Sequence, residues 1–451
     1  MTMDRRRFLI LGTAAAAAVS PAVAAPSPLG ALGVDGAQFG LRPGSADDQS
    51  QAFQRAIDET ARNRTPLAIA PGSYRVGNLR LPANAQLVGV RGATKLILSG
   101  SASLISSSGT EYVTLSGLVL DGQRARLPDR RGLLHVENVR RIRVADCEIV
   151  GAGGIGIACT AVGGEIVDTL LTDSADVAIH SFDARALLIA RNTISGAGNN
   201  GIQVWRGQAG DDGTIVVDNR IEAIDNRAGG SGQYGNAINV FRAANVIVRG
   251  NRIRNCAFSA VRGNAASNFQ IEGNSVTDVR EVAIYAEFGF EGALVANNTI
   301  DGAAIGVSIT NFNQGGRLAS VTGNIIRNLL PKRPAGTDPG DGAGIGIAVE
   351  ADTAVTGNVI ENAPTAGMIL GWGQHLRDVA ATGNVVRTAD IGIGVSVSTG
   401  AGTALIANNM IADVRRAAIV GMDRKRIVTG DLMRGGAERY ANLTMSGNRL
   451  R

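Results

Sequence analysis

The sequence predicts an all-β fold, a parallel β-helix (solenoid) of about 10–13 coils with an N-terminal capping helix. Three observations support this prediction. Glycine supplies 60 of the 451 residues while aromatic residues supply only 4%, which is typical of many short strands joined by tight turns. A short motif recurs along most of the chain, and only one segment has the spacing of a clear amphipathic helix. Because the chain has only 12 prolines and 45% apolar residues, collagen and a fully disordered chain are both excluded.

The recurring motif is the tripeptide Asn-x-Ile or Asn-x-Val, with a mean period of about 27 residues between Asn192 and Asn409. Seven copies place a small and then an aliphatic residue nine positions later, and two of these begin with Cys147 and Thr169 in place of Asn. No copy contains a helical stretch, and a propeller blade needs four strands in about 40 residues, so a stacked coil of two or three strands fits best. The Asn copies are Asn192, Asn219, Asn251, Asn274, Asn298, Asn324, Asn358, Asn384, Asn409 and Asn448.

The repeated Asn has a physical role in such a coil. Asn tolerates left-handed backbone at a sharp turn, and Asn side chains stacked on successive coils can form a hydrogen-bonded ladder. Each coil pairs only with its neighbours, so both ends of the stack require a cover.

The repeats and their covers predict the order of segments along the chain. The amphipathic helix over 47–64 and the first coil or coils form an N-terminal cap within residues 26–100. The β-helix repeats occupy residues 101–430, and residues 431–451 form a C-terminal coil and cap.

The first 25 residues predict an export signal. Arg5-Arg6 with Phe8-Leu9, a short apolar run and Ala22-Val23-Ala24 resemble a cleaved twin-arginine signal peptide. An ordinary secretory signal is the alternative. We therefore expect a periplasmic or extracellular protein that meets the twin-arginine translocase during export and has no membrane contact after cleavage, because no other segment is long and apolar enough to span a bilayer.

Charge and cysteine content exclude several other classes. Basic residues are scattered and are not interleaved with aromatics, so nucleic-acid binding is not expected despite the net charge of +5. The three cysteines have no metal-ligand spacing and read as small buried hydrophobes. We expect no cofactor and no metal site; calcium at Asp211, Asp212 and Asp225 is compatible with the residue types, but their spacing does not require it.

Several segments together resemble a known superfamily. Phe39-Gly40, the helix at Asp47-Asp48, the segment 71–76 (Pro-Gly-Ser-Tyr-Arg-Val) and the Asn-x-Ile…Gly-Ile repeats are similar to the pectin-lyase-like, right-handed parallel β-helix superfamily. The resemblance covers nearly all of the chain after the leader. With the leader, the chain resembles most the twin-arginine-translocated repeat proteins of alphaproteobacteria, a group without an assigned activity.

The resemblance implies a single-stranded, right-handed β-helix and a polysaccharide ligand, because the superfamily holds lyases, glycosidases, epimerases, phage tailspikes and non-catalytic proteins. It does not define the reaction. The polygalacturonase motif set and the Asp-Pro-His-Asp signature of alginate epimerases are both absent, so no catalytic residue is carried over from those families.

Alternation within the repeat predicts an outward stripe of polar and aromatic side chains. Counted from the residue after the small one, positions one and three are aliphatic and should face inward, while positions two and four should face outward. A register slip of one residue would reverse this. The position-two residues are Ala158, His180, Gln203, Asn239, Arg262, Tyr285 and Ser308; the position-four residues are Thr160, Phe182, Trp205, Phe241, Asn264, Glu287, Thr310 and Glu350.

Aromatic faces beside amides and charges are typical of a sugar-binding groove. The alternative is a solvated face whose aromatic side chains shield the strands. The predicted substrate-binding residues are His180, Gln203, Trp205, Phe241, Asn264, Glu287 and Phe182. Insertions at 229–235 and 330–341 flank the stripe and could contribute to it.

Three neighbouring positions are the catalytic candidates. Arg262 and Asn239 could hold the carboxylate of a uronic acid, while Tyr285 acts as base or acid in a lyase or epimerase reaction. This role requires a lowered Tyr285 pKa, for which Arg262 is a plausible cause. We expect an acidic polysaccharide or oligosaccharide as partner, bound along the stacked strands and cleaved or epimerised there.

Two alternatives stay open. The chain could be a non-catalytic carbohydrate-binding or structural envelope repeat protein. It could instead be an inverting glycoside hydrolase that uses Glu287 and Glu350, since carboxyls in such enzymes are roughly 6.5–9.5 Å apart and stacked positions two coils apart are about 10 Å apart.

Overall fold

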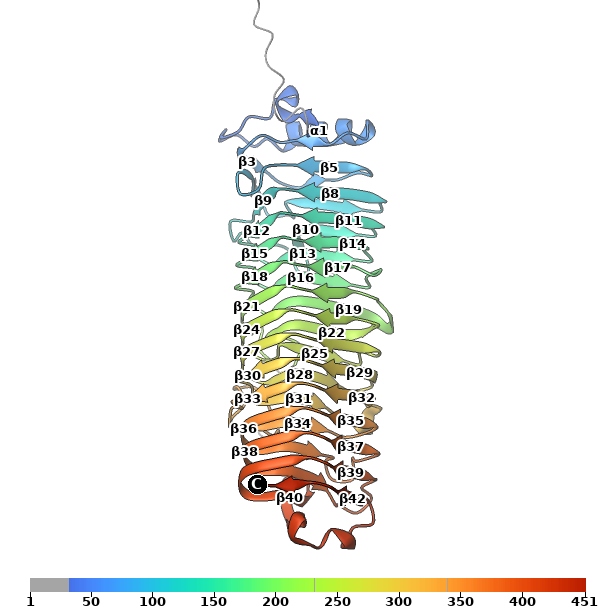
Figure 1. Ribbon diagram of the computed structural model, residues 1–451. Coiled ribbons are helices and arrows are strands. Elements are labelled where there is room, and N and C mark those ends of the chain that lie inside the picture. Colours follow the sequence, from blue (N-terminus) through green and yellow to red (C-terminus); the bar gives the residue numbers. More distant parts are fainter. Residues whose placement is uncertain (1–31, 231, 339) are drawn as a thin grey trace, which may run out of the picture.

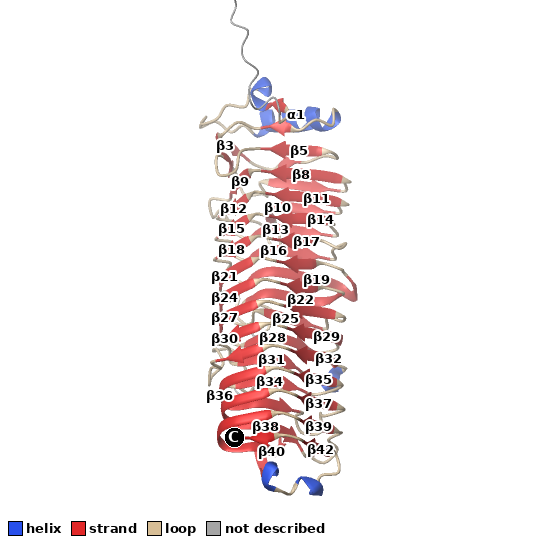
Figure 2. Ribbon diagram, viewed as in Figure 1, coloured by secondary structure: helices blue, strands red, loops and turns tan. Residues whose placement is uncertain are grey.

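The computed structural model describes residues 32–230, 232–338 and 340–451, and it forms a parallel β-solenoid of about fourteen turns (Figure 1). The predicted fold class is therefore confirmed, with slightly more turns than the 10–13 expected. The proposed signal peptide lies outside the described residues. Strands fill the length of the molecule, and short helices lie at its two ends (Figure 2).

One face of the solenoid is a sixteen-stranded sheet. Its strands are β1 (Val34–Asp35), β2 (Leu67–Ala68), β5 (Ala85–Val88), β8 (Tyr112–Ser116), β11 (Arg141–Ala145), β14 (Gly164–Val167), β17 (Leu188–Ala190), β20 (Ile215–Val217), β23 (Ile247–Arg249), β26 (Phe269–Glu272), β29 (Glu291–Ala296), β32 (Arg317–Thr322), β35 (Thr353–Thr356), β37 (Val379–Thr382), β39 (Ala404–Ala407) and β42 (Leu443–Ser446).

A second face, here named the groove face, carries the predicted stripe. Its strands are β4 (Leu79–Arg80), β7 (Ile105–Ser108), β10 (Gly132–Glu137), β13 (Ile155–Thr160), β16 (Val177–Phe182), β19 (Asn200–Asp211), β22 (Asn236–Ala244), β25 (Val261–Asn264), β28 (Val282–Glu287), β31 (Ile305–Ile309) and β34 (Ile345–Val349).

A third face adjoins the groove face. Its strands are β3 (Gly72–Val76), β6 (Thr94–Leu98), β9 (Leu118–Asp121), β12 (Glu148–Val150), β15 (Leu170–Thr172), β18 (Thr193–Ser195), β21 (Arg220–Ile224), β24 (Arg252–Cys256), β27 (Ser275–Val279), β30 (Thr299–Asp301), β33 (Ile325–Arg327) and β43 (Arg449–Leu450). Three long strands run through both faces and join them near the C-terminal end: β36 (Val359–Leu370), β38 (Val385–Ser396) and β40 (Met410–Asp423).

The interior is filled by the aliphatic side chains of all three faces. Ile157, Ile179 and Ile202 stack on successive coils and have no exposed surface. This stacking follows from the repeat, because the same position of each coil faces inward and meets its equivalent in the next coil.

The Asn ladder is present and runs inside the coil. The side-chain amide of Asn274 donates to Asn298 Oδ1 at 3.0 Å and to the Val248 carbonyl at 3.1 Å, and its backbone N–H donates to Asn298 Oδ1 at 2.9 Å. The same pattern continues to Asn448. Thr169 takes the place of Asn in this pattern, because its hydroxyl accepts a hydrogen bond of 3.4 Å from the Cys147 N–H.

The left-handed turn residue is the one before the ladder Asn, which corrects the sequence-based expectation. Gly250 has φ of 66° and Asn297 has φ of 56°. The ladder Asn itself stays in ordinary backbone, because its side chain must point inward to reach the next coil. This explains why Gly precedes several ladder positions, since Gly adopts positive φ without a steric penalty.

Both ends are covered. The helix α1 (Ser50–Arg62) buries Phe53 and Ile57 against the first coils, close to the predicted helix over 47–64. At the other end β41 (Arg426–Asp431) pairs antiparallel with β40, and the short 3-10 helices η4 (Leu432–Arg434) and η5 (Ala437–Arg439) follow. Two further 3-10 turns are η2 (Gly36–Phe39) and η3 (Phe312–Gln314). Within the described residues, no helix is long and apolar enough to cross a membrane.

Candidate functional site

The strand register brings the predicted stripe together on the groove face. Pairing of β13, β16, β19, β22, β25, β28 and β31 places the position-two side chains in one column and the position-four side chains in a second. The first column contains Ala158, His180, Gln203, Asn239, Arg262, Tyr285 and Ser308. The second contains Thr160, Phe182, Trp205, Phe241, Asn264 and Glu287.

The part of the stripe on β16, β19 and β22, here named the upper stripe, is a cluster of side chains that stack on and hydrogen-bond to one another. The ring centroids of His180 and Trp205 are 5.7 Å apart, and those of Trp205 and Phe241 are 6.0 Å apart, both edge-to-face. Phe182 stacks on His180 at 6.2 Å. His180 Nδ1 lies 2.7 Å from Gln203 Oε1, and burial lowers the His180 pKa while this hydrogen bond opposes the shift.

Both the side-chain oxygen and the side-chain nitrogen of Asn239 are hydrogen-bonded to neighbouring groups. The Trp205 indole N–H donates to Asn239 Oδ1 at 2.7 Å, and the Asn239 amide donates to the Gly232 carbonyl at 3.2 Å. The predicted insertion at 229–235 therefore packs over this part of the stripe. Asn239 is only 4% exposed as a result.

Arg262 lies in a buried network of charges. It donates to both carboxylate oxygens of Glu287, at 2.7 and 2.9 Å, and to Glu281 at 3.1 Å. Arg333, from the second predicted insertion, reaches the other oxygen of Glu281 at 3.3 Å. The side chains of Arg262, Glu281, Glu287 and Arg333 are each at most 10% exposed. The guanidinium that was predicted to hold a substrate carboxylate thus already holds two carboxylates of the chain.

The environment of Tyr285 corrects the expected direction of its pKa. Burial raises the pKa of Tyr285 to about 12, and the nearby Glu287 carboxylate adds to the rise. The Arg262 guanidinium lies 4.7 Å from the Tyr285 ring centroid and lowers the pKa, but its effect is smaller than that of burial. Tyr285 is therefore a poor general base in this structure and remains a hydrogen-bond donor.

Below the ion network the groove face opens into a cavity of about 1070 Å³. Its floor continues the position-two column through Tyr285, Ser308, Ala348 and Ile369. Glu350 lines the same cavity, whereas Glu287 does not. The proposed Glu287–Glu350 pair therefore does not share this cavity, since Glu287 is enclosed with Arg262.

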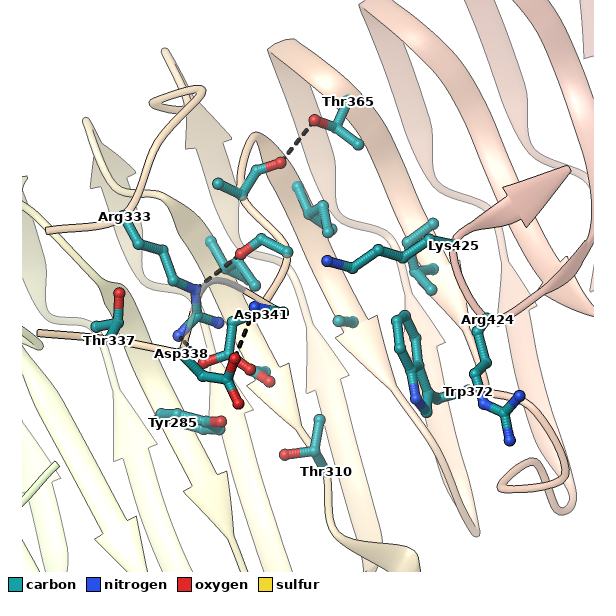
Figure 3. A pocket seen from close by; sticks show the side chains of 18 of the residues that line it. Tyr285, Thr310, Arg333, Thr337, Asp338, Asp341, Thr365, Trp372, Arg424 and Lys425 are labelled. Atoms are coloured by element: carbon teal, nitrogen blue, oxygen red, sulfur yellow. Dashed lines mark hydrogen bonds and ion pairs between the residues drawn. The ribbon is translucent and has the colours of Figure 1, made fainter. Parts of the chain in front are cut away.

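Three segments form the walls of this cavity. The insertion over 330–341 contributes Asp338 and Asp341, and a tight turn contributes Trp372 and His375. The tip of the β40–β41 hairpin contributes two cations, Arg424 and Lys425. Figure 3 shows Asp338 and Asp341 on one side, with Trp372, Arg424 and Lys425 on the other.

Sequence reasoning missed Trp372, His375, Arg424 and Lys425. They stand outside the repeat, in a turn and a hairpin whose positions have no periodic signal. One available signal was the segment Gly371-Trp372-Gly373, because a Trp between two glycines in a chain with only two Trp residues indicates an exposed turn. Trp372 is 37% exposed.

Comparisons with known proteins support the fold. Residues 209–386 match the family model described as a right handed beta helix region. No curated protein sequence matches the chain.

Two solved structures share the fold at TM-scores above 0.5, and a third is less similar. The N-terminal fragment of bacteriophage phi29 gene product 12 is 16% identical, covers 93% of this chain and 71% of its own, and has a TM-score of 0.55. PfbA, a surface adhesin of Streptococcus pneumoniae, is 16% identical over 86% of this chain and 91% of its own, with a TM-score of 0.51. The A-module of the Azotobacter vinelandii mannuronan C-5 epimerase AlgE6 is 18% identical over 92% and 99%, with a TM-score of 0.43.

These identities show a common fold and nothing finer. The chain is a β-solenoid protein, and its fold is shared with a phage protein and a surface adhesin. Its function has to be argued from its own groove.

Proposed function

We propose that the protein binds an anionic polysaccharide in the cavity on the groove face, and that it does so after export from the cytoplasm. The observation that carries the proposal is an exposed indole, Trp372, on the wall of an open cavity that lies along stacked strands. Aromatic faces provide flat apolar area for sugar rings, and the surrounding hydroxyls, amides and charges provide hydrogen bonds.

Two cations favour an anionic ligand. Within the described part of the chain, neither Arg424 nor Lys425 makes an ion pair, although both line the cavity. Unpaired cations on a cavity wall attract carboxylate or sulfate groups. The Asp338 and Asp341 carboxylates of the opposite wall then orient the bound polysaccharide, because they repel its carboxylate or sulfate groups.

The upper stripe has a smaller part in this proposal than the sequence predicts. Its polar groups are paired with one another, so His180, Gln203 and Trp205 support the wall of stacked strands and could meet a polymer only by their exposed edges. Arg262 and Asn239 act in the proposal as supports for the insertions that border the cavity.

A fluorescence titration tests the proposal, because the chain has only two tryptophans. In the variant Trp205→Phe, Trp372 is the single indole, so we expect its emission to change when pectate, alginate or a glycosaminoglycan is added. Trp372→Ala should weaken the affinity about tenfold, or about 1.4 kcal/mol, whereas Trp205→Phe should retain it. Unchanged emission with all of these polymers would contradict the proposal.

A non-catalytic role, as an adhesin-like or envelope module, is the second candidate. The paired state of His180, Gln203, Asn239 and Arg262 in the stripe favours it, since these groups are engaged with one another and with Glu287. Retained binding without any change of the polymer would support this role.

A further inference from the structure

Glu350, which is half-buried, differs from the two buried glutamates of the groove face, Glu281 and Glu287. It follows β34 and lines the cavity, next to Thr310 of the coil before and Gly371 of the coil after. Glu281 and Glu287 are held by guanidinium groups. Among the described residues, Glu350 has no cationic partner, and no charged group contributes to its pKa shift.

The Glu350 carboxyl is held in place by the backbone. The N–H of Phe312 donates to Glu350 Oε2 at 2.7 Å. Phe312 is itself fixed on two sides: its ring meets His375 edge-to-face at 6.4 Å, and the guanidinium of Arg377 lies 4.4 Å from its centroid. A carboxyl that is oriented before the ligand arrives loses little entropy on binding.

Arg377 is anchored in turn by Asp352. Its Nε and Nη2 donate to the two oxygens of Asp352 at 2.7 and 2.6 Å. The chain of contacts from Asp352 through Arg377 and Phe312 ends at Glu350.

The surroundings favour the protonated form of Glu350. Burial raises its pKa above the ordinary value of 4.5, and the N–H groups of Phe312 and Asn311 oppose this only in part. A carboxylic acid that faces a cavity can donate its proton to a bound ligand.

We propose that Glu350 is the proton donor of the cavity and that the protein hydrolyses a glycosidic bond of the anionic polysaccharide bound there, an inference that rests on the proposed function. The proton of Glu350 moves to the leaving glycosidic oxygen as the bond between that oxygen and the anomeric carbon breaks. A water molecule forms the new bond to the anomeric carbon and gives one proton to a carboxylate.

Asp338 is the carboxylate that receives this proton. Its Oδ1 accepts a hydrogen bond from the Gly340 N–H at 2.6 Å, and it is exposed to the cavity. Asp341, the other carboxylate of this insertion, is engaged with Arg333 at 3.1 Å. After the reaction Glu350 is the carboxylate and Asp338 the acid, and exchange with solvent restores both.

The test separates binding from cleavage. The full chain is incubated with pectate, alginate and a glycosaminoglycan; binding is followed by Trp372 fluorescence, and cleavage by new reducing ends and by ultraviolet absorbance. Glu350→Gln should lower the cleavage rate at least about 100-fold, with the affinity changed less than about threefold. Asp338→Asn should act similarly, and its exposed position leaves folding intact. Glu361→Gln, an exposed glutamate on the third face, is the matched control and should cleave like the wild type.

The outcomes are distinct. Cleavage that falls as the pH rises through the raised Glu350 pKa, and is lost in both cavity variants, supports the inference. Binding without new reducing ends overturns the inference and leaves the proposed function standing. Products with an ultraviolet-absorbing double bond indicate elimination and also overturn it, as does full activity of Glu350→Gln. If none of the polymers binds, the proposed function fails and this inference fails with it.

Discussion

Replacement of Arg262 by Met tests whether this residue supports the structure. The substitution keeps the volume but removes the three hydrogen bonds to Glu281 and Glu287. Glu287 then keeps only the Asn264 amide at 3.2 Å, and Glu281 keeps Ser259 at 3.1 Å and Arg333 at 3.3 Å.

The expected loss is large because both carboxylates remain buried. Removal of one partner from a buried ion pair destabilises a protein by about 3–5 kcal/mol. Equilibrium urea denaturation, followed by circular dichroism, measures the change as a lower midpoint. Because solenoid coils interact only with their neighbours, hydrogen exchange should accelerate first in β25, β28 and the insertion over 330–341.

Two further variants isolate the cause. Arg254→Met removes an exposed pair with Glu222 on the neighbouring third face and should leave the midpoint nearly unchanged. The triple variant Arg262→Met, Glu281→Gln, Glu287→Gln removes the uncompensated charges and should recover most of the stability. A wild-type midpoint for Arg262→Met, together with lost polymer cleavage, would refute the structural role and restore Arg262 as a catalytic candidate.

Three other predictions follow from the same structure. Folding raises the Glu350 pKa above 4.5, so this carboxyl opposes folding increasingly as the pH rises through its folded-state pKa. The variant Glu350→Gln should therefore raise the melting temperature at neutral pH but not below pH 4.5. Equal shifts of the melting temperature at both pH values would contradict the assignment. Arg424→Gln with Lys425→Gln should weaken polymer binding and flatten its salt dependence, whereas Arg252→Gln, an exposed arginine of β24, should do neither when affinity is titrated at several salt concentrations. Asn274→Ala should destabilise by about 1–3 kcal/mol for each buried partner left unpaired in urea denaturation, whereas the exposed neighbour Ser275→Ala should not; equal stability of the two variants would show that the ladder is dispensable.

The periodic part of the chain was predictable and the rest was not. Spacing of the Asn motif and the alternation after it predicted the stacked coils and the register of the stripe, because one side-chain position repeats on every coil. The amphipathic spacing over 47–64 predicted the α1 cap. The reasoning from alternation assumed that every side chain pointing outward from the coil is exposed to solvent. Arg262 and Glu287 point outward yet are buried, since the insertions at 229–235 and 330–341 fold back over this part of the groove face.

The cavity walls have no counterpart in the repeat. Trp372 stands in a turn, and Lys425 stands at a hairpin tip that reaches back along the groove face. Trp372 and Lys425 line the same cavity as Glu350 because of the conformations of individual loops, and a periodic sequence pattern does not predict loop conformation. The direction of the Tyr285 pKa was wrong because the sequence pattern does not show how far the surrounding groups bury the phenol.

The Asn ladder has a consequence for how such a molecule can change over evolutionary time. Successive rungs are separated by as few as 23 residues, between Asn251 and Asn274, and as many as 39, between Asn409 and Asn448, yet the rung bonds stay at 2.9–3.0 Å. The ladder bonds thus fix only the spacing between successive Asn residues, whatever the number of residues between them. New loops can be gained or exchanged on the groove face while the stack keeps its geometry, so binding specificity and architecture can diversify independently.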